Sequence, residues 1–349
     1  MPSWPLDHPV LAVVLGVVGA LLLLRSAPRL GEHRGRSAGA GLLALAMAAY
    51  LNAYFGYLPQ VGDIAGPRPW PVVTAQVVSA DAVVPQRQEP AHPQGAVLRL
   101  SVAGDVSQAP RRDALVYLPP QYFSETSRRF PVLYLLHGSP GVPLDWFRGG
   151  EAAAAGAASA RAGQPVILVA PRMSRSWLAD SECVDSPRLH AETYLVRDVV
   201  PAVDRTLRTL STASSRGVLG NSAGGFCALD VGLRHPELFS AIAALSPVIR
   251  PTYDYGSLSD LFGQPADLSS VVAHHTPAWL LENHPASRSE RIYLDVGDVD
   301  PLRPAVQRFA ALDQQLGGRP SLRVREGGHT YQVWRPALVD AIHWFAAGA

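Results

Sequence analysis

The chain has 349 residues, 48% of them hydrophobic, which suits one large α/β domain with extra segments, or two domains. Its formal net charge is +1, and all of its basic residues other than histidine are arginine. A charge so close to zero gives no electrostatic reason to propose a nucleic acid as a partner. The two cysteines, Cys183 and Cys227, have no metal-ligand spacing. They could form a disulfide only outside the cytoplasm, and Cys227 is otherwise interpreted as a small buried residue.

Two apolar runs open the chain, at residues 4–24 and 38–58. Each reaches the roughly 20 residues that cross a bilayer, and neither shows a polar face. Arginines predominate between them, so the positive-inside rule places that loop in the cytoplasm. We therefore expect a two-span transmembrane hairpin over residues 1–61, with the rest of the chain extracytoplasmic. A cleaved signal peptide fits poorly because the positive charge follows the first run, and a pair of buried soluble helices is the remaining alternative.

Residues 62–93 are rich in proline and weakly patterned, as in a linker. Apolar alternation and continuous apolar runs resume after that, and we assign residues 94–349 to one domain. Strands are expected at 96–102, 113–118, 131–136, 165–170, 217–219, 240–245, 291–296 and 321–326, and helices at 151–162, 192–210, 223–234, 304–316 and 334–346. This alternation predicts an α/β fold with a mostly parallel, doubly wound sheet, whose first two strands form an antiparallel edge.

The segment Gly220-Asn-Ser-Ala-Gly224 fits the pattern G-x-S-x-G. In that pattern a strained turn between a strand and a helix lifts a serine hydroxyl clear of the sheet. The flanking sequence predicts such a strand and such a helix. Ser222 is therefore the candidate nucleophile, and the alternative is a serine that only caps the helix.

A serine nucleophile needs a base to take its proton and an acid to orient that base. His329 follows one predicted strand and Asp300 follows another, so both lie at carboxyl ends of the sheet, where open α/β sheets gather their sites. The order serine, acid, histidine is that of α/β hydrolases. Asp298 is the reserve candidate for the acid, and Asp295 falls within the strand, where we expect a structural role.

The oxyanion of such a reaction needs two N–H donors. His137-Gly-Ser-Pro-Gly141 ends a buried strand, and we expect the backbone N–H groups of Ser139 and Ala223 to form the hole. His137 either stabilises this loop or is a satisfied buried histidine. The pair His274-His275 lacks a third ligand, so no metal site is predicted, and no cofactor is implied.

From about residue 95 onward the chain resembles the putative-esterase family of α/β hydrolases, which includes the esterase D enzymes and the antigen 85 mycolyltransferases. The resemblance rests on 131–138, Trp146, 192–195 with Asp198, 220–225, 297–300 and 327–329. It implies the α/β-hydrolase fold and catalytic roles for Ser222, Asp300 and His329. His137 stands where the mycolyltransferases are expected to carry an acidic residue, and those enzymes lack the amino-terminal hairpin.

Together these features predict a membrane-anchored, extracytoplasmic serine esterase that cleaves carboxylic esters, such as those of envelope lipids, through an acyl-enzyme. One alternative is an acyltransferase that passes the acyl group to a sugar or lipid hydroxyl. Another is a non-catalytic binding protein of the cell envelope. Trp146, Trp177, Asp180 and Tyr194 lie on segments that could line the substrate cleft, or they could serve ordinary packing.

Overall fold

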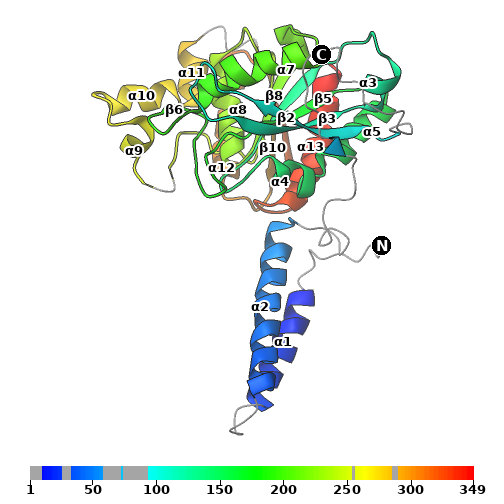
Figure 1. Ribbon diagram of the computed structural model, residues 1–349. Coiled ribbons are helices and arrows are strands. Elements are labelled where there is room, and N and C mark those ends of the chain that lie inside the picture. The colour runs from blue at the N-terminus through cyan, green and yellow to red at the C-terminus, as the bar shows by residue number, and fades with distance from the viewer. Residues whose placement is uncertain (1–9, 26–32, 58–71, 74–92, 254–255, 285–289) are drawn as a thin grey trace. The chain divides into compact units, whose positions relative to one another are not determined.

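The computed structural model describes residues 10–25, 33–57, 72–73, 93–253, 256–284 and 290–349, and divides into two units. One holds residues 1–68, with helices α1 (Val10–Arg25) and α2 (His33–Phe55). These helices pack side by side, with Gly16 close to Ala46 (Figure 1). Both leave large apolar side chains exposed, among them Val13 and Met47.

The two-span prediction is not supported. Helix α1 has 16 residues, which at about 1.5 Å per residue is shorter than the roughly 30 Å hydrocarbon core of a bilayer. Helix α2 begins with His33 and Arg34, so its first turn is polar. No helix within the described ranges is both long and apolar enough to cross a membrane. Residues 4–9 of the first expected span, and most of the linker at 62–93, lie outside the described residues.

A nine-stranded sheet forms the centre of the second unit, in the order β1-β2-β3-β5-β4-β8-β9-β10-β11 (Figure 1). From β5 to β11 all neighbours are parallel, whereas β3 runs antiparallel to both β2 and β5. The strands are β1 (Val72–Val73), β2 (Ala96–Val102), β3 (Arg112–Leu118), β4 (Val132–Leu136), β5 (Ile167–Ala170), β8 (Arg216–Asn221), β9 (Ala241–Leu245), β10 (Arg291–Gly297) and β11 (Ser321–Arg325). The mostly parallel α/β prediction is confirmed, with β1 as an unexpected edge strand.

Helices cover both faces of this sheet. On one face, Gly217 of β8 leaves room for Phe345 of α13 (Tyr331–Ala346). On the same face, Gly156 of α5 (Ala152–Arg161) leaves room for the ring of Tyr117 of β3. On the other face Gly232 of α8 (Ala223–Arg234) packs on Ile242. The same core includes α7 (Val200–Thr206) and α12 (Arg303–Gln315). Both faces are therefore buried, which explains why β4, β5 and β9 are continuous apolar runs.

The helix expected at 192–210 is shorter and less regular than its sequence indicates. It begins as α6 (Ala191–Thr193), widens into a π-helical stretch, η2 (Tyr194–Val199), and continues as α7. Pro201 has no N–H, so the usual hydrogen bond to the residue four positions back is absent there. The N–H of Val200, just before it, bonds to the carbonyl of Leu195, which lies five positions back as in a π-helix.

The remaining short elements were not expected from the sequence. They are α3 (Pro120–Ser124), α4 (Leu144–Arg148), β6 (Asp185–Ser186), β7 (Leu189–His190), η3 (Ala213–Ser215), α9 (Leu258–Phe262), α10 (Leu268–His274) and α11 (Pro277–Asn283).

Candidate active site

Ser222 occupies the sharp turn between β8 and α8. Its backbone has φ 54° and ψ −123°, a region that non-glycine residues rarely adopt. The turn depends on its glycines, because a Cβ on Gly220 would lie 1.8 Å from the Gly224 carbonyl oxygen. A Cβ on Gly224 would lie 2.2 Å from the Leu136 carbonyl oxygen. This close packing holds Ser222 at the carboxyl end of the sheet, and its side chain does not cap α8.

His329 joins Ser222 to Asp300. Its Nε2 lies 2.9 Å from Ser222 Oγ, and its Nδ1 lies 2.9 Å from Asp300 Oδ2. The ring also packs edge-to-face on Trp334, with centroids 4.9 Å apart. The structure thus brings together the three residues that the sequence singled out as nucleophile, base and acid.

The carboxyl group of Asp300 is buried, which opposes its ionisation. The hydrogen bond from His329 and that from the Leu302 N–H, 2.8 Å from Oδ1, outweigh this penalty. The nearby Ser246 hydroxyl adds a smaller effect, with geometry short of a full hydrogen bond. The pKa of Asp300 is therefore held below its ordinary value, and the group is a carboxylate at neutral pH.

Asp298 and Asp295 have other partners. Asp298 is exposed, and its Oδ1 accepts the Gly327 N–H at 2.9 Å. Asp295 is buried and accepts hydrogen bonds from Arg325 and from the Tyr293 hydroxyl. Of the three aspartates in or just after β10, Asp300 is therefore the one that contacts His329.

The expected oxyanion loop lies against the nucleophile turn. A Cβ on Gly138 would lie 3.5 Å from Ser222 Cβ. Among the hydrogen bonds of the described residues, none uses the N–H of Ser139 or of Ala223 as donor. Both groups are therefore available to an oxygen that develops negative charge near Ser222.

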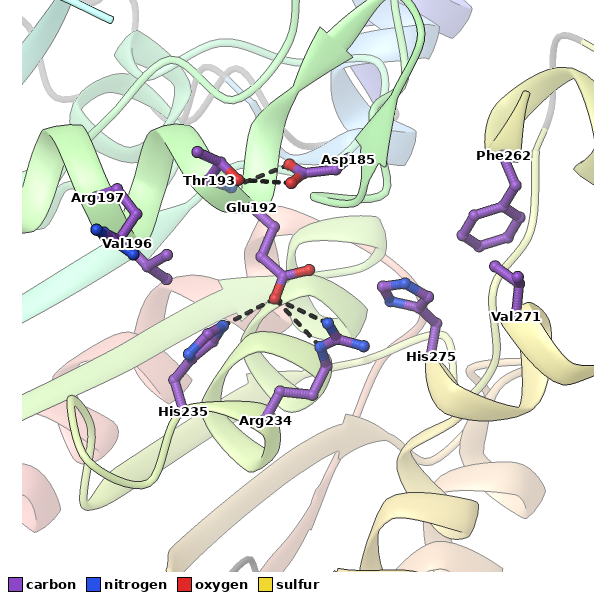
Figure 2. A pocket seen from close by; sticks show the side chains of 10 residues that line it. All are labelled: Asp185, Glu192, Thr193, Val196, Arg197, Arg234, His235, Phe262, Val271 and His275. Carbon is purple, nitrogen blue, oxygen red and sulfur yellow. Dashed lines mark hydrogen bonds and ion pairs between the residues drawn. The ribbon is translucent and has the colours of Figure 1, made fainter. Parts of the chain in front are cut away.

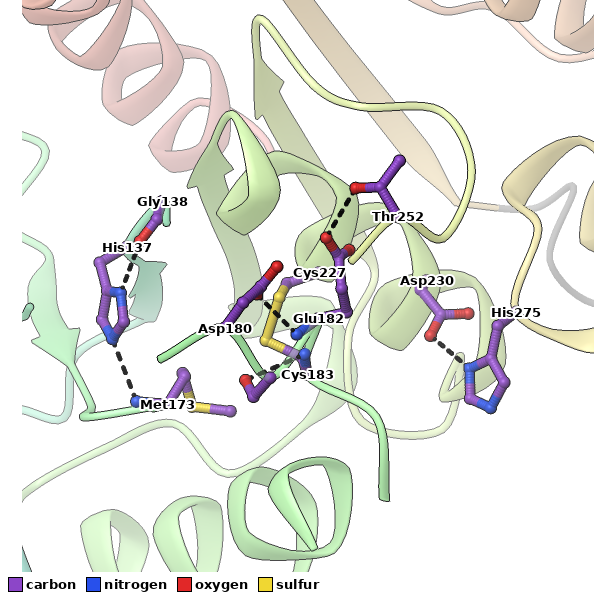
Figure 3. The surroundings of a disulfide bond; sticks show 11 residues. His137, Gly138, Met173, Asp180, Glu182, Cys183, Cys227, Asp230, Thr252 and His275 are labelled. Atoms are coloured by element: carbon purple, nitrogen blue, oxygen red, sulfur yellow. Dashed lines mark hydrogen bonds and ion pairs between the residues drawn. A yellow bond between two sulfur atoms is a disulfide. The ribbon is translucent and has the colours of Figure 1, made fainter. Parts of the chain in front are cut away.

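Cys183 and Cys227 form a disulfide, with Cα atoms 5.3 Å apart (Figure 3). Cys227 is buried, as the sequence predicts, and the disulfide that the sequence left open is present. The bond ties the loop that follows β5 to α8, the helix that begins after the nucleophile. Next to it, Glu182 accepts a hydrogen bond from Thr252 at 3.0 Å (Figure 3). The loop that carries Trp177 is thereby fastened to the site, and the Trp177 carbonyl also accepts the Gly141 N–H at 3.0 Å.

The other residues predicted to line the cleft differ in exposure. Trp146 and Tyr194 are each 1% exposed and pack in the core, so they offer almost no surface to a substrate. Trp177 is 57% exposed, and the adjacent Leu178 is 54% exposed. Asp180 is half-buried and accepts the Glu182 N–H at 3.0 Å, a turn contact within its own loop. Burial favours a packing role for the first two and leaves Trp177 as the most exposed of the four side chains.

Sequence reasoning missed Trp334 and Ser246, which contact His329 and Asp300. Neither belongs to a recognisable motif, because each acts only through its position in the fold. Ser246 follows β9 directly and has φ 46°, a strained backbone that no pattern in the sequence indicates.

A second group of charges surrounds a cavity of about 350 Å³ (Figure 2). There Glu192 pairs with Arg234 and His235, while His275 Nδ1 lies 2.8 Å from buried Asp230. Arg234 is the last residue of α8, whereas Ser222 precedes its first, so this cavity lies about 18 Å away along the helix. Its acids and bases neutralise one another, and it is distinct from the site at Ser222.

Comparison with known proteins agrees with this geometry. The model of the family described as "Putative esterase" matches residues 108–345. An uncharacterized protein of Corynebacterium glutamicum is 29% identical over 319 residues, which cover 86% of this chain and 72% of that protein. A protein of Mycobacterium tuberculosis named as an esterase is 27% identical over 195 residues, 52% of this chain and 42% of its own length.

Solved structures show the same fold. A ferulic acid esterase superposes with a TM-score of 0.63 at 23% identity, covering 73% of this chain and 98% of the other. The family match spans about two thirds of the sequence, from β3 to the last helix. The chain therefore belongs to the putative esterase family, with an α/β-hydrolase type of fold, and is an enzyme that acts on esters, by hydrolysis or by acyl transfer.

Proposed function

We propose that the chain is a serine esterase in which Ser222, His329 and Asp300 form the catalytic triad. The observation that carries this proposal is the pair of 2.9 Å contacts that links Ser222 Oγ through the His329 ring to Asp300. Such a chain of contacts allows one proton to move as the serine attacks. A binding protein has no need of a strained serine aligned with a histidine and a buried carboxylate.

In the proposed first half-reaction, His329 Nε2 takes the proton of Ser222 Oγ as the oxygen attacks the ester carbonyl. The imidazolium that forms is stabilised by the Asp300 carboxylate at Nδ1. The carbonyl oxygen becomes an oxyanion, which we assign to the N–H groups of Ser139 and Ala223. His329 then gives its proton to the leaving alcohol, and an acyl-Ser222 remains.

In the second half-reaction, His329 activates water, which attacks the acyl-enzyme and releases the acid. A sugar or lipid hydroxyl in place of water would give acyl transfer through the same groups. The two outcomes are distinguished by adding alcohol acceptors to the assay. A transacylated product at the expense of free acid indicates a transferase, and unchanged release of free acid indicates a hydrolase.

We further propose an extracytoplasmic enzyme whose substrate carries an apolar acyl group, as an envelope lipid does. The disulfide supports an oxidising compartment. The exposed Trp177 and Leu178, on the loop fastened to Gly141, support an apolar acyl group. For p-nitrophenyl esters, Trp177→Ala should then raise KM more for long acyl chains than for acetate. Val106→Ala is the control, because it removes another half-exposed apolar side chain on a different loop.

The test of the triad is covalent labelling with a fluorescent fluorophosphonate, which reacts with activated serines. The wild type should be labelled and should hydrolyse p-nitrophenyl esters, whereas Ser222→Ala and His329→Ala should do neither. Circular dichroism confirms that each variant is folded. A folded wild type that neither labels nor turns over would refute the proposal and would favour the binding-protein alternative.

A further inference from the structure

His137 is the buried residue between strand β4 and the oxyanion loop, and both of its ring nitrogens have backbone partners. Nδ1 lies 2.9 Å from the Gly138 carbonyl oxygen, and Nε2 lies 3.2 Å from the Met173 nitrogen (Figure 3). One partner belongs to the loop beside Ser222 and the other to the segment after β5. His137 thus bridges two loops at the carboxyl ends of neighbouring strands.

These partners determine which nitrogen carries the proton. The Met173 N–H can only donate, so Nε2 must accept and be unprotonated. The Gly138 carbonyl can only accept, so Nδ1 must carry the hydrogen. Burial, which disfavours the charged ring, lowers the pKa of His137 in spite of the Gly138 contact, consistent with a neutral imidazole.

The hydrogen bond from His137 to the Gly138 carbonyl also acts on the peptide that would supply an oxyanion donor. Gly138 and Ser139 share one planar trans peptide, so the Gly138 C=O and the Ser139 N–H point in opposite directions. A hydrogen bond that holds the carbonyl toward His137 therefore turns the Ser139 N–H away from it. Gly138 lies so close to Ser222 that a Cβ on it would be 3.5 Å from Ser222 Cβ, so this rotation decides whether the Ser139 N–H faces the reacting carbonyl.

We propose that His137, held as its Nδ1–H tautomer by the Met173 N–H, is a positioning residue that orients the Ser139 N–H toward the oxyanion. The inference rests on the proposed esterase function and assigns a role to a group that does not touch the substrate. The loop's other hydrogen bonds lie beyond Pro140, where the Gly141 N–H bonds to the Trp177 carbonyl and the Val142 N–H bonds to Asp145. Among the hydrogen bonds of the described residues, only that of His137 therefore acts on the peptide between Gly138 and Ser139.

Two isosteric variants separate the roles of the two nitrogens. In His137→Asn the side-chain amide lies near the former Nδ1 and can still donate to Gly138, while the Met173 contact is lost. In His137→Gln the amide lies near the former Nε2 and can still accept from Met173, while the donor to Gly138 is lost. If His137 only supports the fold, the activity that each variant loses should follow the stability that it loses. If it orients the peptide, His137→Gln should lose more activity.

The measurements are kcat and KM for a p-nitrophenyl ester, and the inhibition constant of a boronic acid that mimics the tetrahedral intermediate. We expect His137→Gln to lower kcat about tenfold to a hundredfold, less than the hundredfold or more for deleting an oxyanion donor. Its boronate affinity should fall by a similar factor while KM changes less than about threefold, since only the transition state needs the donor. His137→Asn should retain at least about fivefold more kcat than His137→Gln.

The control is His235→Gln, which weakens a contact with Glu192 at the opposite end of α8 and should lower thermal stability without changing kcat. Equal kcat losses in the two His137 variants, or a kcat of His137→Gln within twofold of the wild type, would overturn the inference. Fluorophosphonate labelling of the wild type and not of Ser222→Ala would in either case leave the proposed function standing. Absence of wild-type labelling would instead refute the function itself.

Discussion

The sharpest prediction concerns Asp300→Asn, because the structure determines how the new amide must lie. In the wild type, Asp300 Oδ1 accepts the Leu302 N–H and Oδ2 accepts the proton on His329 Nδ1. The Leu302 N–H can only donate, so the amide oxygen of the asparagine should take that position. The amide NH2 then faces His329 Nδ1, which must become the unprotonated nitrogen. The proton moves to Nε2, and His329 can no longer accept the proton of Ser222.

The expected cost is large. An acid-to-amide change in a serine triad that enforces the wrong histidine tautomer lowers kcat by about 10⁴, or roughly 5.5 kcal/mol of transition-state stabilisation. The assay is kcat for a p-nitrophenyl ester near neutral pH, with circular dichroism to confirm folding. The matched control is Asp298→Asn. Its amide oxygen can still accept the Gly327 N–H, so kcat should stay within about threefold of the wild type. A loss below tenfold in Asp300→Asn, or an equal loss in Asp298→Asn, would refute the assignment of the acid.

The same variant has a signature in stability. The pKa of Asp300 in the folded protein lies below its unfolded value of about 3.9, so the ionised group stabilises the fold at all pH values above about 4. That contribution is lost as the pH falls through the folded pKa. The difference in unfolding free energy between the wild type and Asp300→Asn should therefore be greatest at neutral pH. It should shrink below about pH 4, and urea titrations at pH 7 and pH 3 would detect the change.

Two further predictions concern stability alone. Burial, with a smaller effect of Glu237, raises the pKa of Glu290 to about 8, so the folded state keeps a proton that the unfolded state releases above about pH 4.3. Because Glu290 is only partly buried, solvent screening leaves only a part of this shift as stability. Relative to the wild type, Glu290→Gln should gain at least about 1 kcal/mol of stability between pH 5 and pH 8, and thermal melts at the two pH values that show no such gain would contradict this. The Cys183–Cys227 disulfide joins residues 44 positions apart, and chain entropy gives it a stabilisation of up to about 4 kcal/mol. A reducing agent should lower the urea midpoint of the wild type and leave the double alanine variant unchanged; equal responses would argue against the bond.

Much of the α/β unit could be predicted because its signals are local. Strands buried on both faces are continuous apolar runs, and β2 begins and ends where its alternation does, at Ala96 and Val102. The turn at Ser222 requires glycines that appear directly in the sequence. The preference for Asp300 over Asp298 rested on order and placement, and the structure agrees that Asp300 contacts His329.

What could not be predicted depends on contacts between distant segments. Trp334 orients His329 by packing against its ring, which no periodicity shows. The disulfide was left open because the pairing of two cysteines follows from how α8 lies against the loop after β5. The bounds of the apolar run at 38–58 did not determine the bounds of a helix, since α2 begins before that run, at His33, and carries polar residues in its first turn.

The alignment of Asp300 with His329 depends on how firmly the loops after β10 and β11 are joined. A Cβ on Gly297 would lie 2.1 Å from the Gly327 carbonyl oxygen, so the two backbones approach as closely as glycine allows. Asp298 closes the same junction by accepting the Gly327 N–H.

Beneath these loops, buried Asp295 accepts from Arg325, which also pairs with Asp340 of α13. Strand β10, strand β11 and the last helix are therefore joined by charge as well as by the sheet. Leaving Asp295 buried without its cation would cost several kcal/mol, so this network is stable only while β10 and β11 keep their register. A one-residue slip would move His329 about 3.3 Å along its strand direction and break both of its 2.9 Å contacts. Asp295, which we do not propose as a catalytic residue, thus contributes to the site by fixing the distance between Asp300 and His329, which we do.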